Sequence, residues 1–233
     1  MRVLAVSVAP GDAEMGCGGT LARVIADGGG VAICTLSSGN SRGGGRSPRD
    51  TARDYQAEVG TAASTLGADL IWLGHSDFGV SNDSVTRMQI VDVLRKFRPD
   101  AVLAPASVDT DHDRRDGWRL AVDAAQMAAS SSAHTEHEPL TSIPSVFAYE
   151  PRWVVGFQPD TYVDVTDVIE TKHRAVMHLK SLRQWLKDES GVDITEACEI
   201  VSAYRGLQAG VEFAEAYVST PGFGSSGTTR VLP

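Results

Sequence analysis

The chain is poor in cysteine and in positive charge, and it has no long apolar run. Its three cysteines are odd in number and form no CxxC pair, so neither a disulfide framework nor a thiolate zinc site is indicated. Lysine and arginine number 21 against 30 aspartates and glutamates, which argues against a broad nucleic-acid-binding surface. No stretch approaches the roughly 18 to 20 apolar residues of a membrane span, and the apolar start is too short for a signal peptide. We expect a cytoplasmic protein that binds neither nucleic acid nor membrane, and homo-oligomer formation stays open.

The first half of the chain alternates buried strands with helices. Four apolar runs rich in β-branched residues predict strands: residues 3–9, 31–37, 68–74 and 100–106. Residues with helical spacing follow each run, and this alternation predicts a mainly parallel sheet covered on both faces. The length fits one Rossmann-like, three-layer α/β/α domain over 1–221, with a C-terminal elaboration. Residues 222–233 are small, polar and glycine-rich, and we predict a flexible tail there.

The second half has a less regular pattern. Residues 142–153 and 161–168 predict strands at an irregular sheet edge. One amphipathic helix is predicted over 170–186, and a second helix, with a break at a glycine near 206 or 210, over 194–219. Ligands of parallel sheets bind beyond the carboxyl ends of the strands. The loops expected to carry the site are therefore 9–15, 37–49, 74–80 and 105–117.

Three glycines, Gly16, Gly18 and Gly19, lie at the start of the first helix. They match a dinucleotide-binding fingerprint poorly, because they come late after the strand and no acidic residue ends a second strand. We interpret them as allowing close packing of the helix against a strand. Glu14 is interpreted as a helix-start carboxylate that the helix dipole stabilises.

Several short motifs occur in a fixed order along the chain. The first strand leads into Ala9-Pro10-Gly11-Asp12-Ala13 and then into Gly16-Cys17-Gly18-Gly19-Thr20-Leu21. Later motifs are Glu58 with Leu66-Gly67, Leu73-Gly74 to Asp77, Tyr162 to Asp167 leading into Lys172, Tyr204-Arg205-Gly206, and Phe213 to Ala216. Over nearly its whole length the chain resembles the PIG-L/LmbE-like (GlcNAc-PI de-N-acetylase-like) family of zinc-dependent N-deacetylases and amidases. The resemblance implies hydrolysis of an N-acyl amide by zinc-activated water.

The first family motif, His-Pro-Asp-Asp-Glu, is largely replaced in this chain. The resemblance implies a zinc-binding histidine, a general-base aspartate and a zinc-binding aspartate at its first, third and fourth positions. Ala9 stands for the histidine and Gly11 for the base, so only Asp12 is retained.

The second family motif, Asp-x-His-x-Asp-His, aligns with residues 109–114. Asp109 and Asp113 are retained, Asp111 replaces the first histidine, and Arg114 replaces the final histidine, which the resemblance makes a zinc ligand. At the family's usual substrate-binding arginine the chain has Tyr55, with Arg53 nearby.

An alanine, a carboxylate and an arginine cannot hold zinc as a set, so we predict no metal cofactor. Arg114 supplies positive charge instead and is expected to pair with Asp12. We assign catalysis to Asp111 or His112 as proton acceptor and to Arg114 as the group that holds an oxyanion or a substrate carboxylate. The predicted substrate-binding residues are Asp12, Arg53, Tyr55, Asp109 and Asp113.

Three functions stay open at this point. The leading hypothesis is a divergent enzyme acting on a small polar metabolite, N-acylated or amino-bearing, such as an amino sugar, without the zinc–water mechanism. The second is a metal-dependent N-deacetylase whose site has shifted to Asp12, Asp111 and His112. The third is a non-catalytic pseudoenzyme that binds a small ligand. Residues 134–138 contain two histidines but no helical HExxH pattern, and we interpret them as a surface loop.

Overall fold

The computed structural model describes residues 1–152 and 154–220. The tail predicted at 222–233 lies outside the described residues. Within the described part, no helix is long and apolar enough to cross a membrane.

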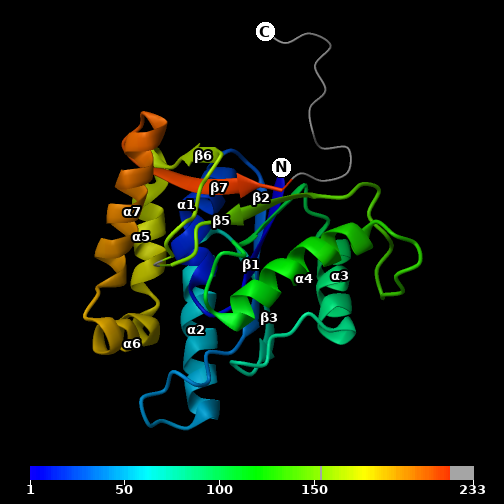
Figure 1. Ribbon diagram of the computed structural model, residues 1–233, viewed down its shortest axis with the longest axis horizontal. Helices are drawn as coiled ribbons and strands as arrows, with labels where there is room; N and C mark the ends of the chain where they lie inside the picture. Colours follow the sequence, from blue (N-terminus) through cyan, green and yellow to red (C-terminus); the bar gives the residue numbers. More distant parts are fainter. Residues whose placement is uncertain (153, 221–233) are drawn as a thin grey trace.

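Seven strands form one mostly parallel sheet in the order β3-β2-β1-β4-β5-β7-β6 (Figure 1). The strands are β1 (Arg2–Ser7), β2 (Gly30–Ser37), β3 (Asp69–His75), β4 (Ala101–Pro105), β5 (Ser145–Tyr149), β6 (Thr161–Asp164) and β7 (Ala214–Ser219). The five strands β1 to β5 pair in parallel, while β7 runs antiparallel to both β5 and β6. The predicted mainly parallel sheet is confirmed.

Helices cover both faces of the sheet, which completes the predicted three layers (Figure 1). One layer contains α1 (Asp12–Ala26), α2 (Pro48–Leu66), α5 (Ile169–Met177), α6 (Lys180–Ser190) and α7 (Ile194–Ala209), with the 3-10 turn η1 (Thr166–Val168) before α5. The other contains α3 (Ser84–Phe97) and α4 (His112–Ala128). Successive residues of β1 serve the two layers alternately, since Val3 and Ala5 pack in the core under α1 and α2 while Leu4 and Val6 pack in the core under α3 and α4.

Three predictions in the second half are corrected by the structure. The helix predicted over 170–186 is two helices, because the N–H groups of His178 and Leu179 bond three residues back and end α5. The turn buries Leu179 in the core before α6 begins. The helix predicted over 194–219 ends at Gly210, whose φ of +75° closes α7, and the remainder forms β7. The strand predicted within 142–153 is β5, which does not lie at a sheet edge because it pairs with β4 on one side and β7 on the other.

The glycines of α1 allow the close packing that the sequence indicated. A Cβ on Gly19 would lie 2.8 Å from Val165 Cγ1, and one on Gly16 would overlap the ring of Tyr149. Side chains at these positions would push α1 away from the sheet and from the start of η1.

Glu215 of β7 joins three elements through one buried carboxylate. It accepts hydrogen bonds from the backbone N–H groups of Gly19 (2.8 Å) and Thr20 (2.7 Å) in α1. Its Oε1 lies 2.7 Å from Nζ of Lys172 in α5, and both side chains are only 3% exposed. Through this ion pair and these two hydrogen bonds, the Glu215 carboxylate holds α1, α5 and β7 together at the core.

Replacing Glu215 with alanine leaves the Lys172 ammonium buried without its counter-ion. We expect Glu215→Ala to lower the free energy of unfolding by about 3 to 5 kcal/mol, measured by urea denaturation. Glu212→Ala, at an exposed glutamate in the preceding turn, is the matched control and should change stability by less than about 0.5 kcal/mol. Equal stabilities of the two variants would contradict this role of Glu215.

Glu14 is fully buried, which corrects its interpretation as a simple helix-start carboxylate. Neither of its carboxylate oxygens has a hydrogen-bond partner among the described residues. Burial raises the pKa of Glu14 from 4.5 to about 7, and the negative charge of Asp12 adds to the rise. The folded protein therefore holds a proton on Glu14 that the unfolded chain releases near pH 4.5.

This raised pKa makes the contribution of Glu14 to stability depend on pH. The contribution is full below about pH 4.5 and is lost as pH rises through about 7. Glu14→Gln stays neutral at every pH. We therefore expect the unfolding free energy of the variant minus that of the parent protein to increase by about 3 kcal/mol from about pH 4.5 to about pH 8. Urea denaturation at both pH values measures this difference, and a difference that does not change with pH would show that Glu14 has an ordinary pKa.

Candidate functional site

The candidate site lies where the strand order reverses. From β1 the chain moves outward to β2 and β3, and then crosses back to β4 and β5 on the other side of β1. Such a reversal leaves a crevice at the carboxyl ends of the strands, where ligands of open α/β sheets bind. A cavity of about 220 Å³ lies at this edge, lined by residues that follow β1, β4 and β5 and by α5 and α7.

Asp12 enters the cavity from the turn that follows β1. Gly11 has a φ of +93°, a conformation that glycine adopts without strain, and a Cβ there would also overlap Leu182 of α6. The turn directs Asp12 Oδ2 back to the N–H of Ala9 at 2.9 Å. Gly11 thus fixes the position of Asp12 as α1 begins.

Arg114, in the first turn of α4, forms two parallel hydrogen bonds with Asp12. Its Nε donates to Oδ2 at 2.9 Å, and its Nη2 donates to Oδ1 at 2.8 Å. The side chains are only 8% and 5% exposed. The pairing expected between these two residues is present, and it joins the start of α1 to the start of α4.

Each partner of this pair stabilises the charge of the other. Burial alone would raise the pKa of Asp12, but the positive charge and hydrogen bonds of Arg114 bring it below its usual value. Burial alone would lower the pKa of Arg114, but the charge of Asp12 raises it, helped by Asp109 and Asp111. Both groups therefore stay ionised across the physiological pH range.

The other carboxylates of residues 109–114 have distinct positions. Asp111 caps α4 by accepting the N–H of Arg114 (3.3 Å), and its Oδ2 also accepts from Nη1 of that arginine (3.3 Å). Asp109 is buried, and its Oδ2 lies 3.8 Å from Nε of Arg114. Asp113 accepts a hydrogen bond from the N–H of Phe78 and so fixes the loop after β3. Burial raises the pKa of both Asp109 and Asp113. One guanidinium therefore stands among three carboxylates, with Asp113 facing a neighbouring loop.

The structure does not bring all the predicted site residues together. Tyr55 of α2 is fully buried, its hydroxyl has no hydrogen-bond partner in the described ranges, and burial raises its pKa to about 12. Arg53 is 70% exposed and pairs with Asp50 and Asp54 on the surface. The His112 side chain is 67% exposed and lies 3.6 Å from Asp113 instead of turning toward Asp12.

Several charged residues of the cavity were not assigned to the site from the sequence, although Lys172 and Arg205 lie in motifs that carry the family resemblance. Lys172 and Arg205 line it, paired with Glu215 and Glu150 respectively. Arg152 lines it as well, three residues after β5 ends. The signal that could have identified Arg152 is its position after a buried strand, but that strand was assigned to an irregular edge.

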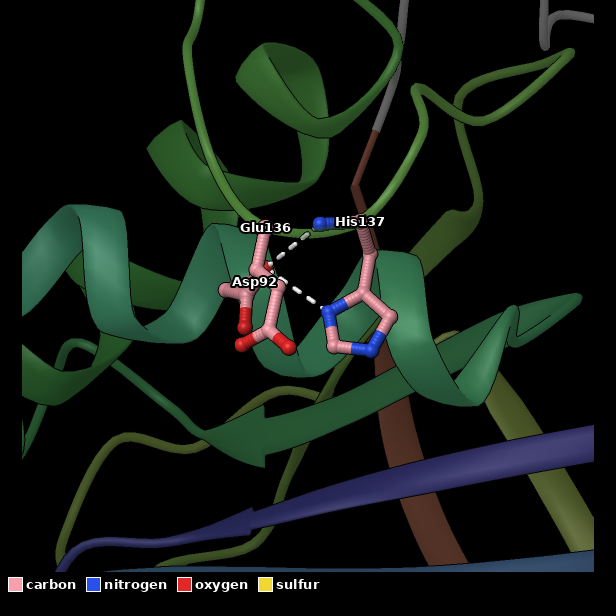
Figure 2. Close-up of side chains that lie close together, drawn as sticks. All are labelled: Asp92, Glu136 and His137. Atoms are coloured by element: carbon pink, nitrogen blue, oxygen red, sulfur yellow. Dashed lines mark hydrogen bonds and ion pairs between the residues drawn. The ribbon is translucent and has the colours of Figure 1, made fainter.

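A separate group of potential metal ligands lies between α3 and the loop after α4 (Figure 2). Asp92, Glu136 and His137 are the one group of three such residues, within the described part of the chain, whose ligand atoms lie within 4.8 Å of one another. Asp92 Oδ1 is already bonded to the backbone N–H of His137 (3.1 Å) and to its ring Nδ1 (2.9 Å), as Figure 2 shows. These bonds account for the position of the loop, which agrees with its interpretation as a surface loop, and we assign no metal to it.

Comparison with known proteins gives a family from the sequence and related folds among solved structures. The family model described as PIG-L: GlcNAc-PI de-N-acetylase matches residues 4–125. The chain is 29% identical to 4-oxalmesaconate hydratase of Pseudomonas putida, over 65% of this chain and 64% of the hydratase, which is less than two thirds of that relative. It is 28% identical to diacetylchitobiose deacetylase of Thermococcus kodakarensis, over 95% of this chain and 84% of that protein.

Solved structures extend the comparison. A conserved protein from Thermus thermophilus superimposes with a TM-score of 0.82 at 31% identity, covering 94% of both chains. The N,N'-diacetylchitobiose deacetylase from Pyrococcus horikoshii gives a TM-score of 0.83 at 22% identity, covering 95% of this chain and 84% of that one, and shows the shared fold. Since the family model matches just over half of the chain, this protein belongs to the PIG-L (GlcNAc-PI de-N-acetylase) family.

Proposed function

We propose that this PIG-L protein acts on a small polar metabolite without zinc-activated water. The observation that supports this most directly is the double hydrogen bond between Arg114 and Asp12. The family resemblance implies zinc ligands at positions 9, 12 and 114, which are alanine, aspartate and arginine in this chain. A guanidinium has donors only and cannot coordinate a cation, and both oxygens of Asp12 are already engaged by it. These residues do not fit a zinc ion, so no step of the mechanism passes through one.

In the proposed mechanism the cleft's own side chains carry the proton and the charge. Asp111 or His112, next to Arg114 at the start of α4, accepts a proton from a water molecule as the water oxygen bonds to the acyl carbon. The same group then returns the proton to the amine nitrogen as the C–N bond breaks, so that an acid and an amine leave. Arg114 makes three hydrogen bonds to described side chains and has five N–H groups, so it has donors left for an oxyanion that develops in the cavity. Asp12 keeps this guanidinium charged and oriented.

The substrate class proposed is an N-acylated or amino-bearing metabolite, such as an amino sugar. The deacetylase relative supports this class by its name, while the other curated relative is named a hydratase. Family membership alone therefore does not decide the reaction, which depends on the groups in the cleft.

A non-catalytic ligand-binding protein is the second candidate. It is favoured by Gly11, which provides no side chain at the position where the resemblance implies a general base. The shifted metal site has less support, because the exposed side chain of His112 does not converge with Asp12.

Zinc content tests the proposed loss of the metal. After equal exposure to zinc and desalting, we expect far less than one zinc per chain in the natural protein, measured by plasma mass spectrometry. The double variant Ala9→His/Arg114→His restores three ligands together with Asp12 and should retain close to one zinc per chain. Arg114→His alone, with two ligands, is the matched control and should retain little. Stoichiometric zinc in the natural protein that is lost in Asp12→Ala would overturn the proposal.

Turnover in the presence of a chelator tests the proposed catalytic groups. We expect amine release from an N-acetyl amino sugar panel to persist in EDTA and to fall about 100-fold in Arg114→Ala. Asp111→Asn leaves the buried Asp12–Arg114 pair intact and should also lower kcat, whereas Arg119→Ala, at an exposed arginine of α4, should not. Full activity in separate alanine variants of Asp111, His112 and Arg114 would refute the site, and saturable binding without amine release would favour the second candidate.

A further inference from the structure

Two arginines beside the cleft have no acidic partner in the part of the chain that the structure describes. Arg42 lies in the loop after β2, and Arg152 follows β5 and lines the cavity. Their guanidinium carbons lie 5.1 Å and 6.0 Å from the centre of the same ring, that of Trp185 in α6. Two positive charges therefore gather around one indole ring.

Both arginines also have buried donors that are not used. Nη1 of Arg42 and Nη1 of Arg152 are each inaccessible to solvent and have no hydrogen-bond partner among residues 1–152 and 154–220. The hydroxyl of Tyr55 is a third such donor, and it lies close enough for the charges of both arginines to act on its pKa. A buried donor without an acceptor is unfavourable, and more so when it is charged.

The other buried cations of the described chain do have partners. Arg114 pairs with Asp12 and Lys172 with Glu215. Arg95 donates to three backbone carbonyl oxygens and to a threonine hydroxyl. For Arg152 the pKa is instead lowered to about 10, first by burial and then by the charge of Arg114. Nε of Arg183 is also buried without a partner in the described chain, but that arginine pairs with Asp193, whereas the half-buried Arg42 and Arg152 have no ion pair there. An anion would satisfy both residues.

We propose that Arg42 and Arg152, with the Tyr55 hydroxyl, bind a carboxylate group of the ligand that occupies the cleft. This inference rests on the proposed function, because it places the ligand in the cavity beside the Asp12–Arg114 pair, and it adds the chemical class of that ligand. The carboxylate lies at Arg152, and the reacting part of the ligand faces Arg114 on the same cavity wall.

The donors available favour a carboxylate over a phosphate. Phosphate sites commonly use free N–H groups at a helix N-terminus. At the start of α1 the N–H of Asp12 is bonded to the Ala9 carbonyl, and that of Ala13 to Ser7 Oγ. The donors that are left belong to planar guanidinium groups, which can bind two oxygens of a carboxylate or of a phosphate, so the charge of the anion decides between them. The nearby carboxylates Asp12 and Asp109 also oppose a dianion more strongly than a single negative charge.

Succinate is the probe that tests this site, and succinamide is its uncharged counterpart. Isothermal titration of protein that has been treated with EDTA and then desalted is expected to show saturable binding of succinate and none of succinamide. We expect Arg42→Gln and Arg152→Gln each to weaken succinate binding at least about tenfold. Arg49→Gln, which removes the same charge from an exposed position just after the Arg42 loop, should leave binding unchanged.

Thermal unfolding separates ligand binding from a structural role of these arginines. Since Arg42 and Arg152 make no ion pair with a described residue, their glutamine variants should unfold at or above the temperature of the natural protein. Arg152→Lys keeps the charge without the planar fork and should bind succinate more weakly than the natural protein.

Four outcomes would overturn the carboxylate site. Two concern binding specificity: succinate and succinamide bind equally well, or inorganic phosphate binds more tightly than succinate. The other two concern the variants: Arg49→Gln and Arg152→Gln weaken succinate binding equally, or Arg42→Gln and Arg152→Gln both unfold at a lower temperature than the natural protein. None depends on zinc or turnover. Stoichiometric zinc would therefore refute the proposed function and leave the anion site intact, whereas loss of succinate binding would remove only the ligand class.

Discussion

The buried pair of Asp12 and Arg114 is the interaction on which the rest of the cleft depends. Either charge alone would be buried without a counter-ion, which is strongly unfavourable, but two parallel hydrogen bonds satisfy both. The pair connects the first turns of α1 and α4 across the point where the strand order reverses. The pair also engages both oxygens of Asp12, which is retained from the three functional positions of the first family motif. The same contact thus stabilises the fold locally and determines which chemistry the cleft can perform.

The charges around this pair fall into two groups. Two ion pairs line the cavity: Lys172 with Glu215 joins α5 to β7, and Arg205 with Glu150 joins α7 to the segment after β5. Arg42 and Arg152 have no such partner among the described residues, and their positions around Trp185 carry the inferred carboxylate site. A net charge of −9 therefore gives little indication of what the cleft binds, since local pairing decides which cations are available to a ligand.

The hydrophobic pattern of the sequence predicted the elements that form through contacts within a short stretch of chain. The first four strands, their helices and the approach of Asp12 to Arg114 follow from runs of apolar residues and from the rule that loops after parallel strands meet at one edge. Pairing between distant segments was not predictable in this way: β7 forms only because β5 and β6 accept it, and Arg152 reaches the cleft only because β5 lies beside β4. The exposed position of Arg53 follows from helix geometry. Two residues along a helix differ by about 200° of rotation, so Arg53 and Tyr55 could not both face the cavity, and only Tyr55 is buried.

Crystals grown with zinc and measured at the zinc absorption edge offer the most direct test of the central claim. We predict no anomalous peak beside Asp12. We also predict that the guanidinium of Arg114 lies within hydrogen-bond distance of both carboxylate oxygens of Asp12. A peak about 2 Å from an oxygen of Asp12, with Arg114 turned away, would contradict it.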